Sequence, residues 1–464
     1  MTALSIGGQT WSTKLARIGE LSTKDRTLVF NNLGHIIDVE MLKSMFEQLD
    51  GRKAIGIDGV TKTKYAKHLD ENLENLVRKI RRGTYCSKAS RITEIPKEDG
   101  SVRPLAISCF EDKILQMAVS RILQTIYEPL FLSSSYGFRP GQNCHDALRA
   151  LHDATFKHKD GAVVEIDIRK YFNSIPHGPL NEFLQRKIND SRFLRLIDIM
   201  IKAPTIRNAN VEENNQGSPQ GSILSPVLSN IYLHHVIDEW FQTIRKTHIK
   251  GEAEHIRYCD DMIFVFEHMI DAERFYKVLP LRLAKFGLEM HRDKSNLVPS
   301  GHLAAKRMHK EGKRIPTYQF LGFRCYWGLS RNGWLWRLKC KSRGDRFAAK
   351  LKSLRKYLKE NLAENTEKVL CKVKSVVRGW MNYHAISDNE PCVSKFRILS
   401  KKALFWWINR KGGRRKMNWE RFERLLLRID YPKYRPTISM LYHQEGLARA
   451  CYRERSAGNL HAAF

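Results

Sequence analysis

The sequence predicts an α+β fold from two kinds of local pattern that occupy different parts of the chain. Apolar residues recur at spacings of three and four between residues 346 and 411, which indicates helices. Short β-branched runs bounded by turn residues, such as GAVVEIDI at residues 161–168, indicate buried strands. With 464 residues, the chain is long enough for two or three domains.

The remaining elements follow in order along the first 270 residues. Residues 21–85 have a helical pattern with a glycine-rich break at residues 56–60 (GIDGV). Residues 95–107 (IPKEDGSVRPLAI) predict two strands around the turn KEDG. Residues 111–131 favour a helix, and residues 256–266 (IRYCDDMIFVF) favour a hairpin with polar residues at its tip. Two separate strands should therefore each present carboxylates.

The composition points to a polyanionic partner. The 80 lysines and arginines outnumber the 49 acidic residues, which gives a formal net charge of +31. Nucleic acid suits such a charge, because each phosphate that is neutralised releases a counterion. An apolar run of 18 residues and a signal-like start are both missing from the sequence, so no membrane partner is expected. The nine cysteines stand singly, without a CxxC pair, which predicts reduced thiols in a cytoplasmic protein.

The positive charge is concentrated in residues 301–464, which hold 38 lysines and arginines against 12 acidic residues. Within them, residues 346–411 predict three basic helices. One such helix could equally present an ordinary solvated face. Three in succession, with Trp380, Trp406 and Trp407 among the charges, favour nucleic-acid binding through phosphate contacts and stacking.

Three aspartates are candidates for chemistry. Asp167 lies at the end of the strand pattern 161–168, and Asp260 and Asp261 are adjacent in the predicted hairpin turn. A single aspartate in such a place is usually a cap or turn residue. Carboxylates after buried strands are costly, however, unless they are paired or bind a metal. Converging carboxylates would suit the hard divalent metals that phosphoryl transfer requires.

Eight motifs, in one order between residues 55 and 410, together resemble the bacterial group II intron-encoded reverse transcriptases. These motifs are IPKEDGSVRPLAI, SSYGFRPGQNCHDAL (134–148), VVEIDIRKYFNSI (163–175), NQGSPQGSILSPVLSNIYLH (215–234), RYCDDMIFVF (257–266), GLEMHRDKSNLV (287–298), QFLGFRC (319–325) and RGWMNYH (378–384). The resemblance implies a polymerase that uses Mg²⁺, or Mn²⁺ as an alternative, to extend a DNA primer on an RNA template from deoxynucleoside triphosphates. It also implies group II intron RNA as a partner, and a nucleoid-associated location in a bacterium.

The resemblance further implies a right-hand polymerase architecture. The expected parts are a helical N-terminal extension (1–60), fingers (61–160), a palm with an antiparallel sheet (161–325), a helical basic thumb or maturase domain X (326–415) and a short C-terminal extension (416–464). A nuclease domain of the HNH kind is not expected, because residues 418–464 hold only one cysteine and two histidines.

Site residues are carried over from the family position by position. The expected metal ligands are Asp167, Asp260, Asp261 and the carbonyl of Ile168. The expected nucleotide-binding residues are Lys97, Arg103, Ile168, Phe172, Gln220 and Lys294, with Phe172 as the steric gate against a 2′-hydroxyl and Lys294 near the leaving pyrophosphate. The expected nucleic-acid contacts are Arg139, Arg378, Lys401, Lys402, Arg410 and Lys411. Simpler roles remain open: Phe172 could be a core residue, and Lys97, Arg103 and Lys294 could be solvated.

Two positions depart from the family pattern. Cys259 stands in YCDD where alanine is usual, and Ser222 stands where a glycine usually follows PQG. These departures do not change the expected reaction. They leave the biological role open. The leading hypothesis is a reverse transcriptase that also assists splicing of its intron. The alternatives are a domesticated polymerase that serves DNA repair or defence, and an RNA-binding splicing cofactor with an inactive polymerase site.

Overall fold

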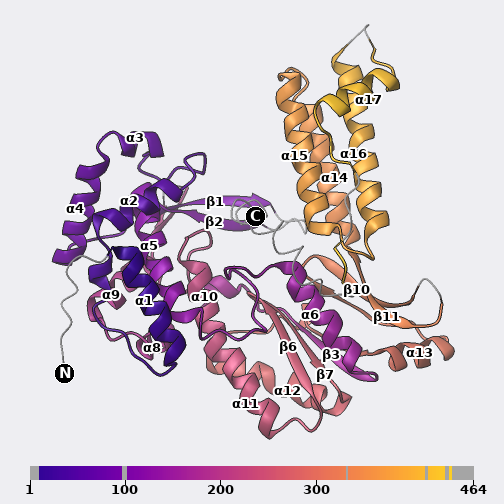
Figure 1. The fold of residues 1–464 in the computed structure, drawn as a ribbon, viewed down its shortest axis with the longest axis horizontal. Helices are drawn as coiled ribbons and strands as arrows, with labels where there is room; N and C mark the ends of the chain where they lie inside the picture. Colours follow the sequence, from indigo (N-terminus) through magenta and orange to yellow (C-terminus); the bar gives the residue numbers. More distant parts are fainter. Residues whose placement is uncertain are drawn as a thin grey trace. The chain divides into compact units, whose positions relative to one another are not determined.

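The computed structural model describes residues 10–96, 102–208, 210–330, 333–412, 416–433 and 438–440 (Figure 1). The chain mixes helices with several small sheets, as the α+β prediction requires. It forms two compact units. The first contains residues 1–144, 166–264 and 270–296, and the second contains residues 145–165, 265–269 and 297–464.

Helices make up most of the first unit. They are α1 (Trp11–Lys24), η1 (Gly34–Ile36), α2 (Val39–Gln48), α3 (Lys62–Ala66), α4 (Leu69–Arg82), α5 (Phe110–Tyr127), α7 (Tyr171–Ser174), α8 (His177–Gln185), α9 (Ser191–Ile201), α10 (Ser225–Leu233), the π-helix η2 (His234–Asp238), α11 (Glu239–Thr247), α12 (Met269–Lys285) and η3 (Arg292–Lys294). The predicted helical stretch 21–85 with a break at 56–60 is confirmed in outline, because no helix of the described part crosses that break.

Helix α4 illustrates why these segments are helical. Its first turn carries two acidic residues and its last turn three basic ones, which complements the helix dipole. Gly83 then ends the helix with a left-handed φ of 71°, a conformation that glycine adopts without steric cost. Leu73, Leu76 and Val77 form the buried stripe at helical spacing.

The first of the sheets has the strand order β2-β1-β4-β5. Its strands are β1 (Ser90–Pro96), β2 (Val102–Ile107), β4 (Thr205–Arg207) and β5 (Asn210–Glu212). Strands β1 and β2 pair in antiparallel fashion, with Ile95 opposite Arg103, so the predicted hairpin is confirmed. Its turn at residues 97–101 lies outside the described residues.

The strands that lead to the aspartates belong to a sheet with the order β6-β7-β3-β8. They are β3 (Gly161–Ile166), β6 (Ala253–Tyr258), β7 (Asp261–Phe266) and β8 (Asn296–Ser300). Cys259 and Asp260 alone connect β6 to β7, and Cys259 has a left-handed φ of 58°. A positive φ at the first turn position is a common requirement of two-residue hairpin connections. The predicted strand at 161–168 and the predicted hairpin are both confirmed.

The second unit contains α6 (Cys144–Lys157), α13 (His302–Lys310), and a three-stranded sheet β11-β10-β9 built from β9 (Thr317–Phe320), β10 (Phe323–Leu329) and β11 (Trp336–Ser342). Four further helices follow: α14 (Gly344–Glu360), α15 (Thr366–His384), α16 (Glu390–Lys411) and α17 (Trp419–Arg428). Helices α14, α15 and α16 lie side by side (Figure 1). The three predicted basic helices are therefore confirmed.

The core of this helical bundle corrects one expectation about stacking. Trp380 and Trp407 are buried in the apolar cluster between the helices, where Trp380 stacks on Phe396 with ring centroids 4.5 Å apart. Their rings are needed for packing and are not available to a nucleic acid. Trp406, by contrast, is 75% exposed on α16. Of the three tryptophans, it is the one that could stack on a base.

Candidate active site

The candidate site begins with Asp167, which directly follows β3. Its backbone N–H donates to Ser295 Oγ (3.1 Å), and its carbonyl accepts from the backbone N–H of His291 (2.8 Å). These bonds tie the end of β3 to the segment before β8, and the Asp167 side chain remains 37% exposed. The Lys294 ammonium lies 3.9 Å from Asp167 Oδ2. The structure therefore brings this predicted lysine next to the predicted metal ligand.

Asp260 and Asp261 occupy the tip of the β6–β7 hairpin, where Asp260 is half-buried and Asp261 exposed. Burial raises the pKa of Asp260, and the charge of Asp167 raises it further. The Arg103 guanidinium and the Cys259 thiol act in the opposite direction. Asp260 and Asp167 therefore lie close enough to repel each other, and Asp261 directly follows Asp260 in the chain.

This donor set fits a divalent metal. Crowded carboxylates offer the hard oxygen ligands that Mg²⁺ and Mn²⁺ prefer, and a bound cation would relieve the repulsion that raises the pKa of Asp260. Ile168 follows Asp167 with its side chain buried, and its backbone bridges to Met290. These contacts fix the backbone next to the first carboxylate.

The turn that contains Gln220 packs against the hairpin strand of Arg103. The backbone N–H of Ala106, on β2, donates to the Gln220 carbonyl (2.6 Å). A β-carbon on Gly221, whose φ is 107°, would lie 2.6 Å from the Ala106 carbonyl oxygen, so only glycine allows this approach. Arg103 in turn acts electrostatically on Asp260. Gln220, Arg103 and Asp260 therefore belong to one region of the first unit.

Phe172 contacts the turn that contains Gln220 through its backbone. It is half-buried in α7, five residues after Asp167, and its carbonyl accepts from the backbone N–H of Ser218 (2.7 Å). Gly217 has a φ of 89°, and a β-carbon there would lie 2.7 Å from the Asn173 carbonyl oxygen. Backbone contact between α7 and the start of this turn, at Gly217 and Ser218, thus positions Phe172. Lys97, the remaining predicted nucleotide ligand, lies outside the described residues.

With this geometry in hand, comparison with known families gives a clear result. Residues 95–325 match the family described as reverse transcriptase (RNA-dependent DNA polymerase). The chain therefore contains a reverse transcriptase domain. The matched range includes every predicted residue of the metal and nucleotide sites, from Lys97 to Lys294.

Similar proteins include several encoded by introns. The group II intron-encoded protein LtrA of Lactococcus lactis is 34% identical over 225 residues, which cover 47% of this chain and 37% of the relative. Protein YkfC of Escherichia coli is 34% identical over 212 residues, or 45% of this chain and 54% of that protein. An uncharacterized 91 kDa protein in a cob intron of Schizosaccharomyces pombe is 37% identical over 175 residues, or 37% and 21%. The chain spans about half or less of each relative, so the similarity concerns the reverse transcriptase domain rather than a whole-protein activity.

Several residues that support the reverse transcriptase site had not been singled out from the sequence. Ser295 and His291 hold the backbone of Asp167 through the bonds described above. Arg257, two residues before Cys259, is completely buried and donates to the Cys259 carbonyl (3.3 Å). An arginine in the strand that leads directly into the aspartate pair was the available signal for this contact.

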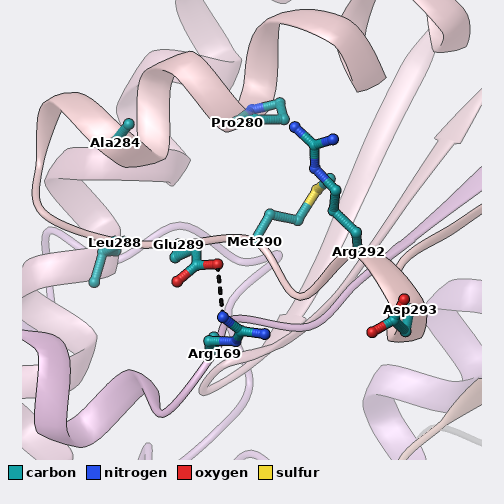
Figure 2. Close-up of a pocket in the computed structure, with 8 residues that line it drawn as sticks. All are labelled: Arg169, Pro280, Ala284, Leu288, Glu289, Met290, Arg292 and Asp293. Atoms are coloured by element: carbon teal, nitrogen blue, oxygen red, sulfur yellow. Dashed lines mark hydrogen bonds and ion pairs between the residues drawn. The ribbon is translucent and has the colours of Figure 1, made fainter.

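A pocket of about 360 Å³ is lined in part by the residues on either side of His291, which holds the Asp167 carbonyl. Its lining consists of Arg169, Pro280, Ala284, Leu288, Glu289, Met290, Arg292 and Asp293. Figure 2 shows the Arg169 guanidinium bonded to Glu289 at 3.0 Å, across one side of the pocket. The backbone N–H of Arg169 also donates to the Glu289 carbonyl (2.8 Å). The pocket wall thus joins the chain after Asp167 to the chain before His291.

Arg139, predicted to contact nucleic acid, is bonded within the protein. Its buried guanidinium donates to Glu128 (3.0 Å) and to the carbonyls of Leu132 and Ser135 (2.6 Å each). These bonds give Arg139 a role in holding the loop after α5, and they leave its predicted contact without structural support.

The other predicted nucleic-acid contacts lie on the helical bundle of the second unit. Arg378 pairs with Asp430 (3.0 Å), and Lys401 pairs with Glu423 and lies over the Trp419 ring. Lys411 donates to the Glu364 carbonyl. Lys402 and Arg410 are exposed on α16.

Within the residues that the structure describes, no helix has the length and apolar character to cross a membrane.

Proposed function

We propose that the chain is an RNA-directed DNA polymerase whose catalytic groups are Asp167, Asp260 and Asp261. The observation that supports this proposal is the proximity of Asp167 and Asp260 at the ends of neighbouring strands, with Asp261 next in the chain, inside a reverse transcriptase domain. A divalent metal, when bound, would supply Lewis-acid activation of the phosphoryl transfer. The three carboxylates would hold it, with the Ile168 carbonyl as a further oxygen ligand.

The surrounding residues have distinct roles in this proposal. Arg103, and Lys97 on the same hairpin, bind the triphosphate, and Gln220 packs against the incoming nucleotide. Lys294, 3.9 Å from Asp167, is close enough to the metal ligands to donate a proton to the leaving pyrophosphate. The proposed right hand has fingers at 61–160, a palm at 161–325 and a thumb at 326–415, and residues of both compact units contribute to the fingers and to the palm.

Primer extension tests this proposal directly. The purified chain is given a DNA primer on an RNA template, deoxynucleoside triphosphates and either Mg²⁺ or Mn²⁺, with a primed DNA template in parallel. We expect metal-dependent extension on RNA. If neither template supports extension while structured RNA still binds, the chain is instead a splicing cofactor with an inactive polymerase site.

Phe172→Ala should relax the choice of sugar. An aromatic ring at this position would clash with a 2′-hydroxyl, and the variant removes the ring but leaves the backbone bond to Ser218 intact. We expect the ratio of ribonucleotide to deoxynucleotide incorporation to rise at least about tenfold, the factor that about 1.4 kcal/mol of relieved clash gives. Single-nucleotide incorporation with each substrate measures the ratio. An unchanged ratio would make Phe172 an ordinary core residue.

Trp406→Ala should weaken nucleic-acid binding. Trp406 lies on the exposed face of α16, with Lys402 and Arg410 one turn away on either side. Loss of one stacked base costs about 1–3 kcal/mol, so the dissociation constant for single-stranded RNA should rise about 5- to 150-fold. Fluorescence anisotropy measures it, and the thermal midpoint should hardly move because the side chain is exposed.

Trp406→Phe is the matched control, because it keeps an aromatic ring and should retain most of the affinity. Lys402→Gln and Arg410→Gln should each lower the salt dependence of binding by about one phosphate contact. Equal affinity of wild type and Trp406→Ala at every salt concentration would exclude this helix face as a binding surface.

Splicing of a group II intron is the finer part of the proposal. It is supported by the likeness to the intron-encoded protein LtrA, which covers 37% of that relative. The DNA around the gene separates the alternatives. A folded group II ribozyme sequence on both sides would support a maturase, and its absence would favour a domesticated polymerase in repair or defence.

A further inference from the structure

Arg257 is a completely buried charged residue close to the Cys259–Asp260 turn. It lies in β6, two residues before the Cys259–Asp260 turn, and it is 0% exposed. A buried guanidinium is costly unless each of its nitrogens is bonded. Its partners should therefore reveal what the arginine holds in place.

One side of the guanidinium is occupied by Asp238, the last residue of the π-helix η2. Arg257 Nε and Nη2 donate to the two Asp238 oxygens at 2.8 and 2.6 Å, a bidentate pair. Although burial opposes the charged form, Arg257 holds the pKa of Asp238 well below its usual range. His255 Nε2 lies 3.3 Å from the same carboxylate. The pair is thus a fixed anchor inside the first unit.

The remaining nitrogen, Nη1, connects this anchor to the catalytic turn. It donates to Asn230 Oδ1 (3.0 Å) and to the Cys259 carbonyl (3.3 Å). Asn230 in turn donates to the Gly137 carbonyl (2.7 Å). Cys259 is the residue with the left-handed φ of 58°, which costs energy for any residue with a β-carbon. The Arg257 bond holds the peptide group between Cys259 and Asp260 at this strained position.

We propose that Arg257 is a positioning residue of the polymerase site, which holds the Cys259 carbonyl and thereby orients the Asp260 and Asp261 carboxylates for metal binding. The inference rests on the proposed function of those aspartates. The competing explanation is that Arg257 stabilises the core and has no separate effect on the turn. The two explanations differ in what a lysine at this position should do.

Arg257→Lys is the decisive variant. A lysine can keep the charge pair with Asp238, but it lacks the planar fork that reaches Asn230 and Cys259 at the same time. We expect kcat for nucleotide incorporation to fall about 10- to 100-fold, because a misplaced catalytic group costs rate even when the fold persists. The KM for the nucleotide should change less than about twofold, since the variant should not alter how tightly the nucleotide binds before it reacts.

A second measurement does not depend on turnover. Binding of Mn²⁺ to the free protein, followed by electron paramagnetic resonance, should be several-fold weaker in Arg257→Lys than in wild type. Arg282→Lys provides the matched control. Arg282 donates to the carbonyls of Val236 (2.9 Å) and His235 (3.3 Å) in the same π-helix and so contacts η2 rather than the hairpin turn. This control should keep wild-type kcat and Mn²⁺ affinity.

Weaker Mn²⁺ binding and lower kcat in Arg257→Lys alone would support the positioning role. Wild-type values of kcat and Mn²⁺ affinity in Arg257→Lys would overturn it. So would similar losses of kcat and Mn²⁺ affinity in both variants, in proportion to the decrease in their thermal midpoints. If the wild-type protein binds Mn²⁺ but extends no primer, the proposed polymerase function fails. The Mn²⁺ comparison would still decide whether Arg257 orients the turn.

Discussion

Replacing Asp260 and Asp261 together with alanine should abolish primer extension while leaving the protein folded. The rate of deoxynucleotide incorporation on a primed RNA template should fall at least about a thousandfold, the factor that about 4 kcal/mol of lost transition-state stabilisation gives. The thermal midpoint should not fall, because the change removes the repulsion between Asp260 and Asp167 that helps to raise the pKa of Asp260. Single-turnover incorporation and thermal unfolding measure the two effects.

Glu212→Ala combined with Glu213→Ala is the control for this change. These two residues are also adjacent, acidic and exposed in the first unit, but they lie at the end of β5 and directly after it, and neither is a predicted metal or nucleotide ligand. The control should keep the wild-type rate. Substantial extension by the aspartate variant would show that the chemistry does not depend on the hairpin carboxylates.

Gly137→Ala should have the second-largest effect, although Gly137 carries no catalytic group. Residues 134–137 run beside β6, where Tyr136 N–H donates to the Arg257 carbonyl (2.8 Å) and Arg257 N–H donates to the Ser134 carbonyl (2.9 Å). A β-carbon on Gly137 would collide with the Cys259 amide nitrogen and lie 2.9 Å from the Tyr258 carbonyl carbon. Because the atoms that the new β-carbon would meet belong to the backbone, the hairpin would have to move.

We expect Gly137→Ala to lower the free energy of unfolding by about 1–3 kcal/mol, as overpacking of a tight interior does. Primer extension should fall about 100-fold, because the carboxylates move with the hairpin. Gly178→Ala in α8 is the control: no atom lies within 4 Å of its β-carbon position, so this variant should be as stable as wild type or slightly more so. A Gly137→Ala protein with wild-type rate and thermal midpoint would show that the turn tolerates displacement.

Local sequence was sufficient to predict the elements that carry the aspartates. The β-branched run before Asp167 and the polar tip of the hairpin at Asp260 are patterns of a few residues, and both became the predicted structures. The expectation that these carboxylates converge came from family resemblance, because no local pattern predicts that β3 and β7 are neighbours in one sheet.

Long-range packing accounts for what the sequence did not reveal. The partners of Arg257 are 19 and 27 residues away in the chain, so neither spacing nor periodicity pointed to them. The three bundle tryptophans looked alike in sequence, yet helix packing buries Trp380 and Trp407 and exposes Trp406. Arg139 was predicted to contact nucleic acid, and its side chain donates to Glu128 within the protein.

The π-helix η2 explains how one helix presents two side chains to one arginine. Helix α10, η2 and α11 follow one another without a break from Ser225 to Thr247, and η2 accommodates one more residue than a regular helix would at that point. Asn230 precedes η2 and Asp238 ends it, and on a regular helix, which advances about 100° per residue, their side chains would point about 80° apart. The wider turn of η2 reduces this angle, and both residues contact Arg257. A substitution that converted η2 to a regular helix without a deletion would therefore separate the two partners of Arg257.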